Sequence, residues 1–167
     1  MNLIVLSPNW LGDAVMALPA LADLRRHFGS ARLTVAARRS VAPLFEMVEG
    51  VDAVLTLPGR GGMASLLSWR GDAAAIGAGA FDLAVLFPNS FAAALAASRA
   101  GVAEIWGYRS DRRARLLTRA VARPRGPLHQ AAYYQALVET LGVTPGPRYA
   151  RVTPPAAPDA APGVATP

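Results

Sequence analysis

A single carboxylate stands where this chain is best suited to acid–base chemistry. Asp13 follows an apolar run, residues 3–6, and a short break that contains Pro8 and Gly12. Helical spacing of apolar residues begins after the break, so Asp13 falls where a buried strand meets a helix N-terminus. A carboxylate in that position can accept a proton from a substrate hydroxyl as a general base. The alternative role is an ordinary helix N-cap, which Asp fills well.

Further polar residues follow the predicted strands. Asn89 and Ser90 come after the apolar run Leu83–Phe87, so in a parallel sheet they share the edge of Asp13. Either can bind a ligand, and one of them is expected to cap the next helix. Trp10 can stack on a sugar or cover the edge of the core. The residues predicted to contact substrate are Asn9, Trp10, Gly12, Arg60, Asn89, Ser90 and Arg109.

The basic residues of the chain are all arginines and give a net charge of +6. Arg60 lies in a glycine-rich loop that can bind an anion or be merely mobile. A cluster of arginines, opposed only by Asp111, comprises Arg109, Arg112, Arg113, Arg115, Arg119, Arg123 and Arg125. Arginine forks suit phosphates and carboxylates, so we expect an anionic partner, with a solvated surface as the alternative. The scarcity of interleaved aromatic residues argues against nucleic acid.

Other chemistries are excluded by residues that the sequence lacks. There is no Cys and there are only two His, which argues against disulfides, thiolate nucleophiles and metal sites. The break after the first apolar run holds Gly12 but no G-x-G-x-x-G pattern, so no dinucleotide is expected there. We therefore predict neither metal nor cofactor. No signal peptide or membrane-length apolar run is evident, and we expect a cytoplasmic protein.

The elements that position these residues alternate in type along the chain. Strands are predicted over residues 2–7, 32–37, 53–57, 83–87 and 104–106. Helices are predicted over 13–28, 41–48, 63–76, 91–99 and 128–141, with Gly29 and Gly142 ending the first and last of them. This alternation predicts an α/β fold with a parallel sheet and helices on both faces. Residues 1–152 form the predicted domain, and the Pro/Ala-rich segment 153–167 a linker or tail.

Four segments of the chain resemble the N-terminal half of glycosyltransferase family 9. The most specific is Pro8-Asn9-Trp10-Leu11-Gly12-Asp13-Ala14-Val15-Met16, followed by Leu18-Pro19-Ala20-Leu21. Phe87–Phe91, the Gly107-Tyr108-Arg109 segment with Leu116-Leu117 downstream, and the stretch from His129 to Gly142 follow in the same order. These later segments favour the type II heptosyltransferases of the family. The resemblance covers residues 1 to about 150.

The resemblance implies a Rossmann-like acceptor domain of a GT-B enzyme. It implies metal-independent, inverting transfer of heptose from ADP-heptose to the lipopolysaccharide inner core, with Asp13 as the base. The anionic acceptor would then meet the arginines, and the protein would work at the inner face of the cytoplasmic membrane. The family's donor-binding second domain is absent from the sequence, so we expect this piece alone to be inactive.

One departure from the family concerns the acceptor contacts. Many relatives carry a basic residue after the Asn-Ser-Phe segment, where this chain has Ala92. Two alternatives therefore remain open. The first is a family 9 transferase with another sugar or acceptor. The second is a non-catalytic module that binds anions or nucleotides.

Overall fold

The computed structural model describes residues 1–58, 65–110, 112–147 and 150–153. Within these ranges the chain forms a six-stranded, all-parallel sheet in the order β3-β2-β1-β4-β5-β6. The strands are β1 (Asn2–Leu6), β2 (Arg32–Arg38), β3 (Ala53–Leu57), β4 (Leu83–Leu86), β5 (Glu104–Tyr108) and β6 (Arg119–Val121). The helices are α1 (Leu11–His27), α2 (Ala42–Glu46), α3 (Ser65–Gly77), α4 (Phe91–Arg99), the 3₁₀-helix η1 (Arg113–Leu116) and α5 (Gln130–Thr140).

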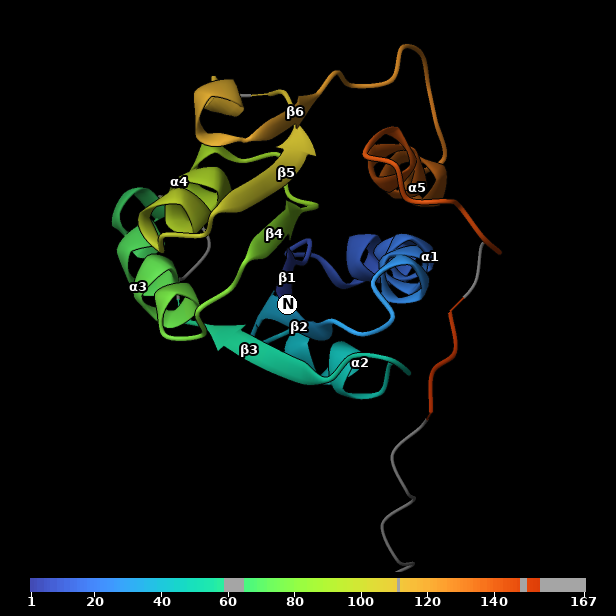
Figure 1. The fold of residues 1–167 in the computed structure, drawn as a ribbon, viewed down its shortest axis with the longest axis horizontal. Coiled ribbons are helices and arrows are strands. Elements are labelled where there is room, and N and C mark those ends of the chain that lie inside the picture. The colour runs from blue at the N-terminus through green and yellow to red at the C-terminus, as the bar shows by residue number, and fades with distance from the viewer. Residues whose placement is uncertain (59–64, 111, 148–149, 154–167) are drawn as a thin grey trace, which may run out of the picture.

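Helices cover both faces of the sheet, as the alternation predicts. Figure 1 shows α3 and α4 on one face and α1, α2 and α5 on the other. The central strands are buried on both sides, and Leu3 and Val5 face one core while Ile4 and Leu6 face the other. The predicted α/β class and its Rossmann-like, doubly wound arrangement are therefore confirmed.

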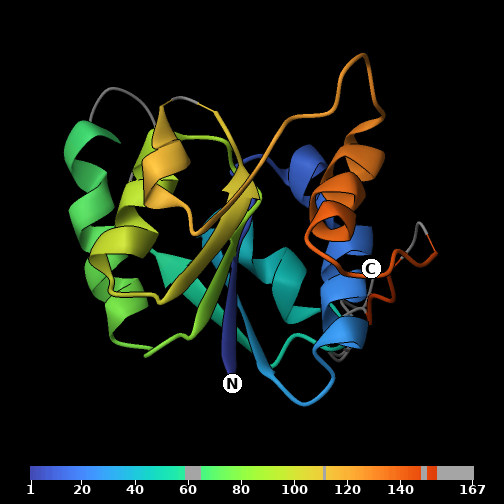
Figure 2. The same cartoon turned by 45° about the horizontal axis from the view of Figure 1, so that its top comes forward.

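The strand order reverses between β1 and β4, and this reversal locates the candidate site. Strands β1 and β4 pair in parallel, with Leu6 opposite Leu86, so both chains leave the sheet at the same edge. In Figure 2, β1 rises from the N-terminus toward that edge, where α1 begins. Doubly wound sheets bind ligands in the crevice at this reversal, beyond the carboxyl ends of the strands.

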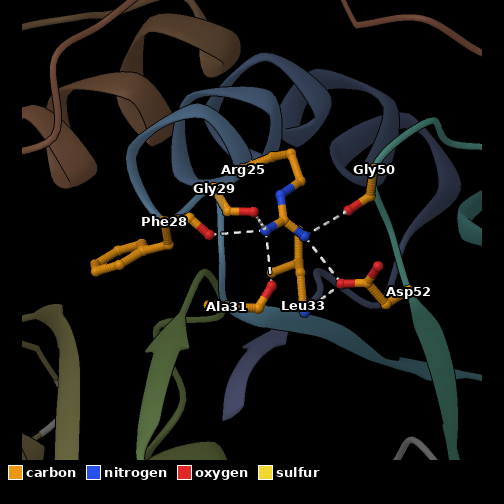
Figure 3. Close-up of polar contacts among 7 residues, drawn as sticks. All are labelled: Arg25, Phe28, Gly29, Ala31, Leu33, Gly50 and Asp52. Atoms are coloured by element: carbon orange, nitrogen blue, oxygen red, sulfur yellow. Dashed lines mark hydrogen bonds and ion pairs between the residues drawn. The ribbon is translucent and has the colours of Figure 1, made fainter. Parts of the chain in front are cut away.

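Helix α1 ends at His27, one residue earlier than predicted, and Gly29 follows its C-cap without adopting a left-handed conformation. Instead, Arg25 Nη2 donates to the carbonyl oxygens of Phe28, Gly29 and Ala31, each at 2.7 Å (Figure 3). A side chain thus binds the carbonyls of the turn that follows the helix, and the last-turn carbonyl of Leu24 accepts from the N–H of Phe28.

The last helix ends as predicted. Gly142 has φ +98 and donates its N–H to the carbonyl oxygen of Glu139 at 2.9 Å. The helix starts later than predicted, however, because His129 occupies its N-cap and its Nδ1 accepts from the N–H of Ala131 at 3.3 Å.

The arginine-rich segment contains the elements that the sequence analysis misses. Strand β5 extends to Tyr108, and both η1 and β6 lie where no element is predicted. The predicted glycine-rich loop with Arg60, the opposing Asp111 and the predicted linker after Thr153 lie outside the described residues. The described residues include no helix long and apolar enough to cross a membrane.

Candidate active site

Asp13 lies in the first turn of α1 and does not cap it. The N-cap is Trp10, whose side chain makes no capping bond, and Asp13 is the third residue of the helix. Its side chain is half-buried and has no hydrogen bond or ion pair with any other described residue. The free N–H groups of this turn favour a negative charge. The structure therefore removes the alternative in which Asp13 is an N-cap and leaves a carboxylate available to a ligand.

The residues just before Asp13 form an open surface. Trp10 is 78% exposed, so it does not cover the edge of the core. Asn9 and Gly12 are also exposed, and no atom lies within 4 Å of the position that a Cβ would take on Gly12. This surface leaves room for a bulky ligand beside the carboxylate.

The loop after β4 brings a second polar group to the same edge. Ser90 is the N-cap of α4, and its Oγ accepts from the N–H of Ala93 at 3.3 Å, which confirms a cap at one of the two predicted residues. Asn89 Nδ2 donates to the Tyr133 hydroxyl at 2.9 Å. Asn89 Oδ1 is buried and has no hydrogen-bond partner among the described residues. Buried acceptors are normally hydrogen-bonded, and the hydroxyl of a ligand can donate this bond.

Two adjacent tyrosines of α5 connect the loop after β4 with the surroundings of Asp13. Tyr133 reaches the loop after β4, and the ring of Tyr134 packs on Phe87 with centroids 5.2 Å apart. Burial raises the pKa of Tyr134, and the negative charge of Asp13 raises it further, so the two side chains are electrostatic neighbours. The Tyr134 oxygen already accepts from Gln130 Nε2 at 3.0 Å, so its own proton remains free to donate.

These tyrosines were not selected as site residues from the sequence. The stretch from His129 to Gly142 suggests them only as part of the resemblance, because nothing in the spacing reveals which strand α5 covers. Once α5 is known to pack beside α1, the first turns of both helices meet at the carboxyl edge (Figure 2). The local signal was the pair of adjacent tyrosines near a helix start.

The predicted arginine cluster separates into buried and exposed members. Arg113 is fully buried, and Arg119 lies over the Trp106 ring at 4.5 Å from its centroid. Arg113 therefore does not belong to the exposed charge of the cluster, because its guanidinium donates to backbone carbonyls. The exposed members of the cluster are Arg109, Arg112, Arg115, Arg119, Arg123 and Arg125. Arg109 follows β5 directly and so stands at the carboxyl edge.

A groove runs beside the carboxyl edge, between α1 and α5. It has a volume of about 490 Å³ and is lined by Val15, Met16 and His129 among others. Val15 and Met16 follow Asp13 by two and three residues and are exposed. The described residues include no cluster of three or more His, Cys, Asp or Glu side chains that could hold a metal ion.

The comparisons with known proteins agree with this geometry. No protein-family model matches the chain. Lipopolysaccharide heptosyltransferase 2 of Escherichia coli K12 is 27% identical over 117 residues, which is 70% of this chain and 34% of that protein. Lipooligosaccharide heptosyltransferase 2 of Haemophilus ducreyi is 27% identical over 121 residues, 70% of this chain and 33% of its own. The chain thus spans about a third of the length of these curated relatives.

Solved structures share the fold. The family 9 glycosyltransferase of Veillonella parvula has a TM-score of 0.75 at 21% identity, over 86% of this chain and 41% of its own. The E. coli ADP-heptose LPS heptosyltransferase II has a TM-score of 0.72 at 24% identity, over 93% of this chain and 47% of its own. With the curated relatives, these structures confirm the resemblance: the chain matches the N-terminal part of the heptosyltransferases of glycosyltransferase family 9.

Proposed function

We propose that this chain is the acceptor-side domain of a glycosyltransferase that moves heptose from ADP-heptose to the lipopolysaccharide inner core with inversion. The names of the curated relatives support the reaction class. The observation that carries the proposal is Asp13, a carboxylate without a partner among the described residues, at the switch point of the sheet. Chemistry in this fold occurs at that edge.

In the proposed reaction, Asp13 accepts the proton of the acceptor hydroxyl. The hydroxyl oxygen forms a bond to the anomeric carbon of the heptose as the bond from that carbon to the ADP oxygen breaks. ADP leaves with the electron pair of that bond, and attack from the opposite face inverts the anomeric configuration. A positioned general base typically contributes about 10²–10⁴-fold to such a rate.

Acceptor recognition is assigned to polar and basic residues around Asp13. Trp10 offers an exposed ring for stacking on a sugar, and Asn89 Oδ1 offers a hydrogen-bond acceptor. Inner-core acceptors carry carboxylates and phosphates, which exposed arginines such as Arg109 pair with well. We assign further contacts to Asn9, Gly12, Ser90 and Arg60.

Donor recognition is assigned mainly to a second domain that these 167 residues do not include. In this proposal residues 1–152 are the acceptor-side domain and 153–167 lead to the donor domain. The first strand–helix break has one glycine and lacks the fingerprint that cradles a pyrophosphate. The protein would act in the cytoplasm, at the inner face of the membrane that carries its acceptor, without a cofactor.

The test is glycosyl transfer by the full-length protein, with mass analysis of the lipopolysaccharide product. A mass increase of one heptose supports the proposal. Addition of another sugar would assign the protein to a different family 9 reaction. If a folded protein bound the anionic acceptor without any transfer, the chain would be a binding module and the proposal would be wrong.

A further inference from the structure

We propose that Arg113 is a positioning residue, which shapes the loop that carries Asn89 and Ser90 and thereby sets affinity for the acceptor. The acceptor part of this inference rests on the proposed function. The sequence places Arg113 among surface charges, but its side chain is fully buried, with a relative exposure of 0%. A buried guanidinium requires partners, because an unpaired buried charge is costly.

Backbone carbonyls from two segments supply those partners. Arg113 Nε donates to the carbonyl oxygen of Tyr108, at the end of β5, at 3.0 Å. Its Nη1 donates to the carbonyl oxygens of Pro88 and, at 3.2 Å, of Ser90, both in the loop after β4. One planar group therefore ties the ends of two neighbouring strands together.

The carbonyl oxygen of Asn89, between Pro88 and Ser90, also accepts a hydrogen bond from the segment that follows β5. Ser110 Oγ donates to the carbonyl oxygen of Asn89 at 2.8 Å. Three consecutive carbonyls, from Pro88 to Ser90, thus accept hydrogen bonds from the segment that follows β5. This anchoring fixes the backbone from which the Asn89 side chain reaches Tyr133 and leaves its Oδ1 without a partner among the described residues.

Gly107 makes room for the guanidinium. A Cβ on Gly107 would lie 3.1 Å from Arg113 Nη2 and 3.4 Å from Leu86 Cβ. At 3.1 Å, the guanidinium must move by a few tenths of an ångström to accept that Cβ, whereas the contact with Leu86 is an ordinary van der Waals contact. Gly107 and Arg113 therefore form one unit, and the glycine can be changed without removing the charge.

Two substitutions, one at Arg113 and one at Gly107, test the proposal, and each has a matched control. Arg113→Lys keeps the charge but loses the Nε donor and the planar fork. Gly107→Ala keeps the arginine in the sequence but displaces its guanidinium. Arg32→Lys, at an exposed arginine at the start of β2, and Gly29→Ala, at an exposed glycine without a positive φ, are the controls.

The first readout needs no activity. In nuclear magnetic resonance spectra of the 167-residue chain, the side-chain amide signals of Asn89 should shift in Arg113→Lys and, less, in Gly107→Ala. They should stay in place in both controls. Wild-type Asn89 signals in both folded variants of the unit would overturn the proposal, and if Arg113→Lys fails to fold, Gly107→Ala alone decides.

The second readout uses the full-length enzyme. Arg113→Lys should raise the KM of the acceptor on the order of tenfold, with the KM of the donor nearly unchanged, because only the acceptor meets this loop. Gly107→Ala should raise it less. An unchanged acceptor KM despite shifted Asn89 signals would overturn the link to acceptor affinity. Shifted signals in a protein that transfers no sugar would support the role of Arg113 in the loop and contradict the proposed function instead.

Discussion

The two ends of α1 carry carboxylates in opposite circumstances. Asp13, in the first turn, is half-buried and has no protein partner among the described residues. Asp23, toward the other end, has a fully buried side chain that forms an ion pair with Arg26. It also accepts from Gln135 Nε2 and from the backbone N–H of Gly146, each at 2.9 Å. Saturation by protein donors identifies Asp23 as structural, whereas Asp13 is available to a ligand.

Arg25, in the last turn of α1, also has a structural role. Arg25 binds three carbonyls that follow α1, and its Nη1 donates to Asp52 at 2.9 Å (Figure 3). Asp52 in turn accepts from the N–H of Leu33 at 2.7 Å, so the end of α1, the start of β2 and the approach to β3 are joined. Charged groups at this end of the helix stabilise the fold, whereas the carboxylate of Asp13 at the other end has no partner among the described residues.

The largest expected effect comes from Asp13→Asn in the full-length enzyme. Loss of the base should lower kcat by about 10²–10⁴-fold, because a carboxamide accepts a proton poorly. The melting temperature should barely change, since Asp13 has no partner to lose among the described residues. A folded variant with wild-type kcat would contradict the assignment, and a large loss of melting temperature would make Asp13 structural.

Asp23→Asn should instead destabilise the fold. The change places an amide N–H₂ among groups that already donate, and removes the charge paired with Arg26. We expect the free energy of unfolding to fall by about 2–3 kcal/mol. Urea titration of the 167-residue chain measures this, and a loss below about 0.5 kcal/mol, the range of ordinary surface changes, would refute the contrast between the two ends.

Arg25→Met should lower the free energy of unfolding by less than Asp23→Asn, about 1–2 kcal/mol. Water can reach some of the carbonyls that the guanidinium leaves. The methionine retains part of the apolar stem. Arg32→Met, at an exposed position, is the control and should be nearly neutral. Equal stability of the two variants in urea would show that the Arg25 contacts contribute nothing.

Substitutions of exposed arginines should have smaller effects, limited to the KM of the acceptor. Arg109→Gln, Arg123→Gln and Arg125→Gln should each raise the acceptor KM a few-fold, and added salt should do the same, since such charges are screened over about 8 Å at physiological ionic strength. The donor KM should stay constant. If neither salt nor substitution alters the acceptor KM, these arginines are a solvated face.

The smallest expected signal is donor binding by the 167-residue chain alone. Calorimetry with ADP-heptose should detect little or no heat of binding, because the first strand–helix break lacks the glycines that would hold a pyrophosphate. Micromolar affinity would contradict the assignment of the donor to a second domain.

Much of the framework follows from local pattern. The predicted bounds of β3 and α4 equal those observed, because apolar runs between Pro, Gly and polar residues leave little choice of type. Parallel pairing then predicts that the residues after β1 and β4 share an edge, and they do. The general location of the candidate site was therefore predictable.

The remaining errors have a common cause in side chains that act on distant backbone. Arg25 binds the carbonyls of the turn after α1, and Arg113 is buried against carbonyls of another loop. Residue type predicts exposure for both, because arginine is rarely buried unless it is paired. The pairs depend on which loops meet in space, and the alternation of apolar and polar residues does not contain that information.

The most direct test of the account is the ratio of kcat for two isosteric variants, Asp13→Asn and Asp23→Asn, in the full-length enzyme at a temperature where both are folded. The account predicts that Asp23→Asn turns over at close to the wild-type rate and that Asp13→Asn is slower by a factor of about 10² or more. Equal kcat values would contradict it, because Asp13, which has no partner among the described residues, would then contribute no more to the reaction than Asp23, whose oxygens accept from three donors.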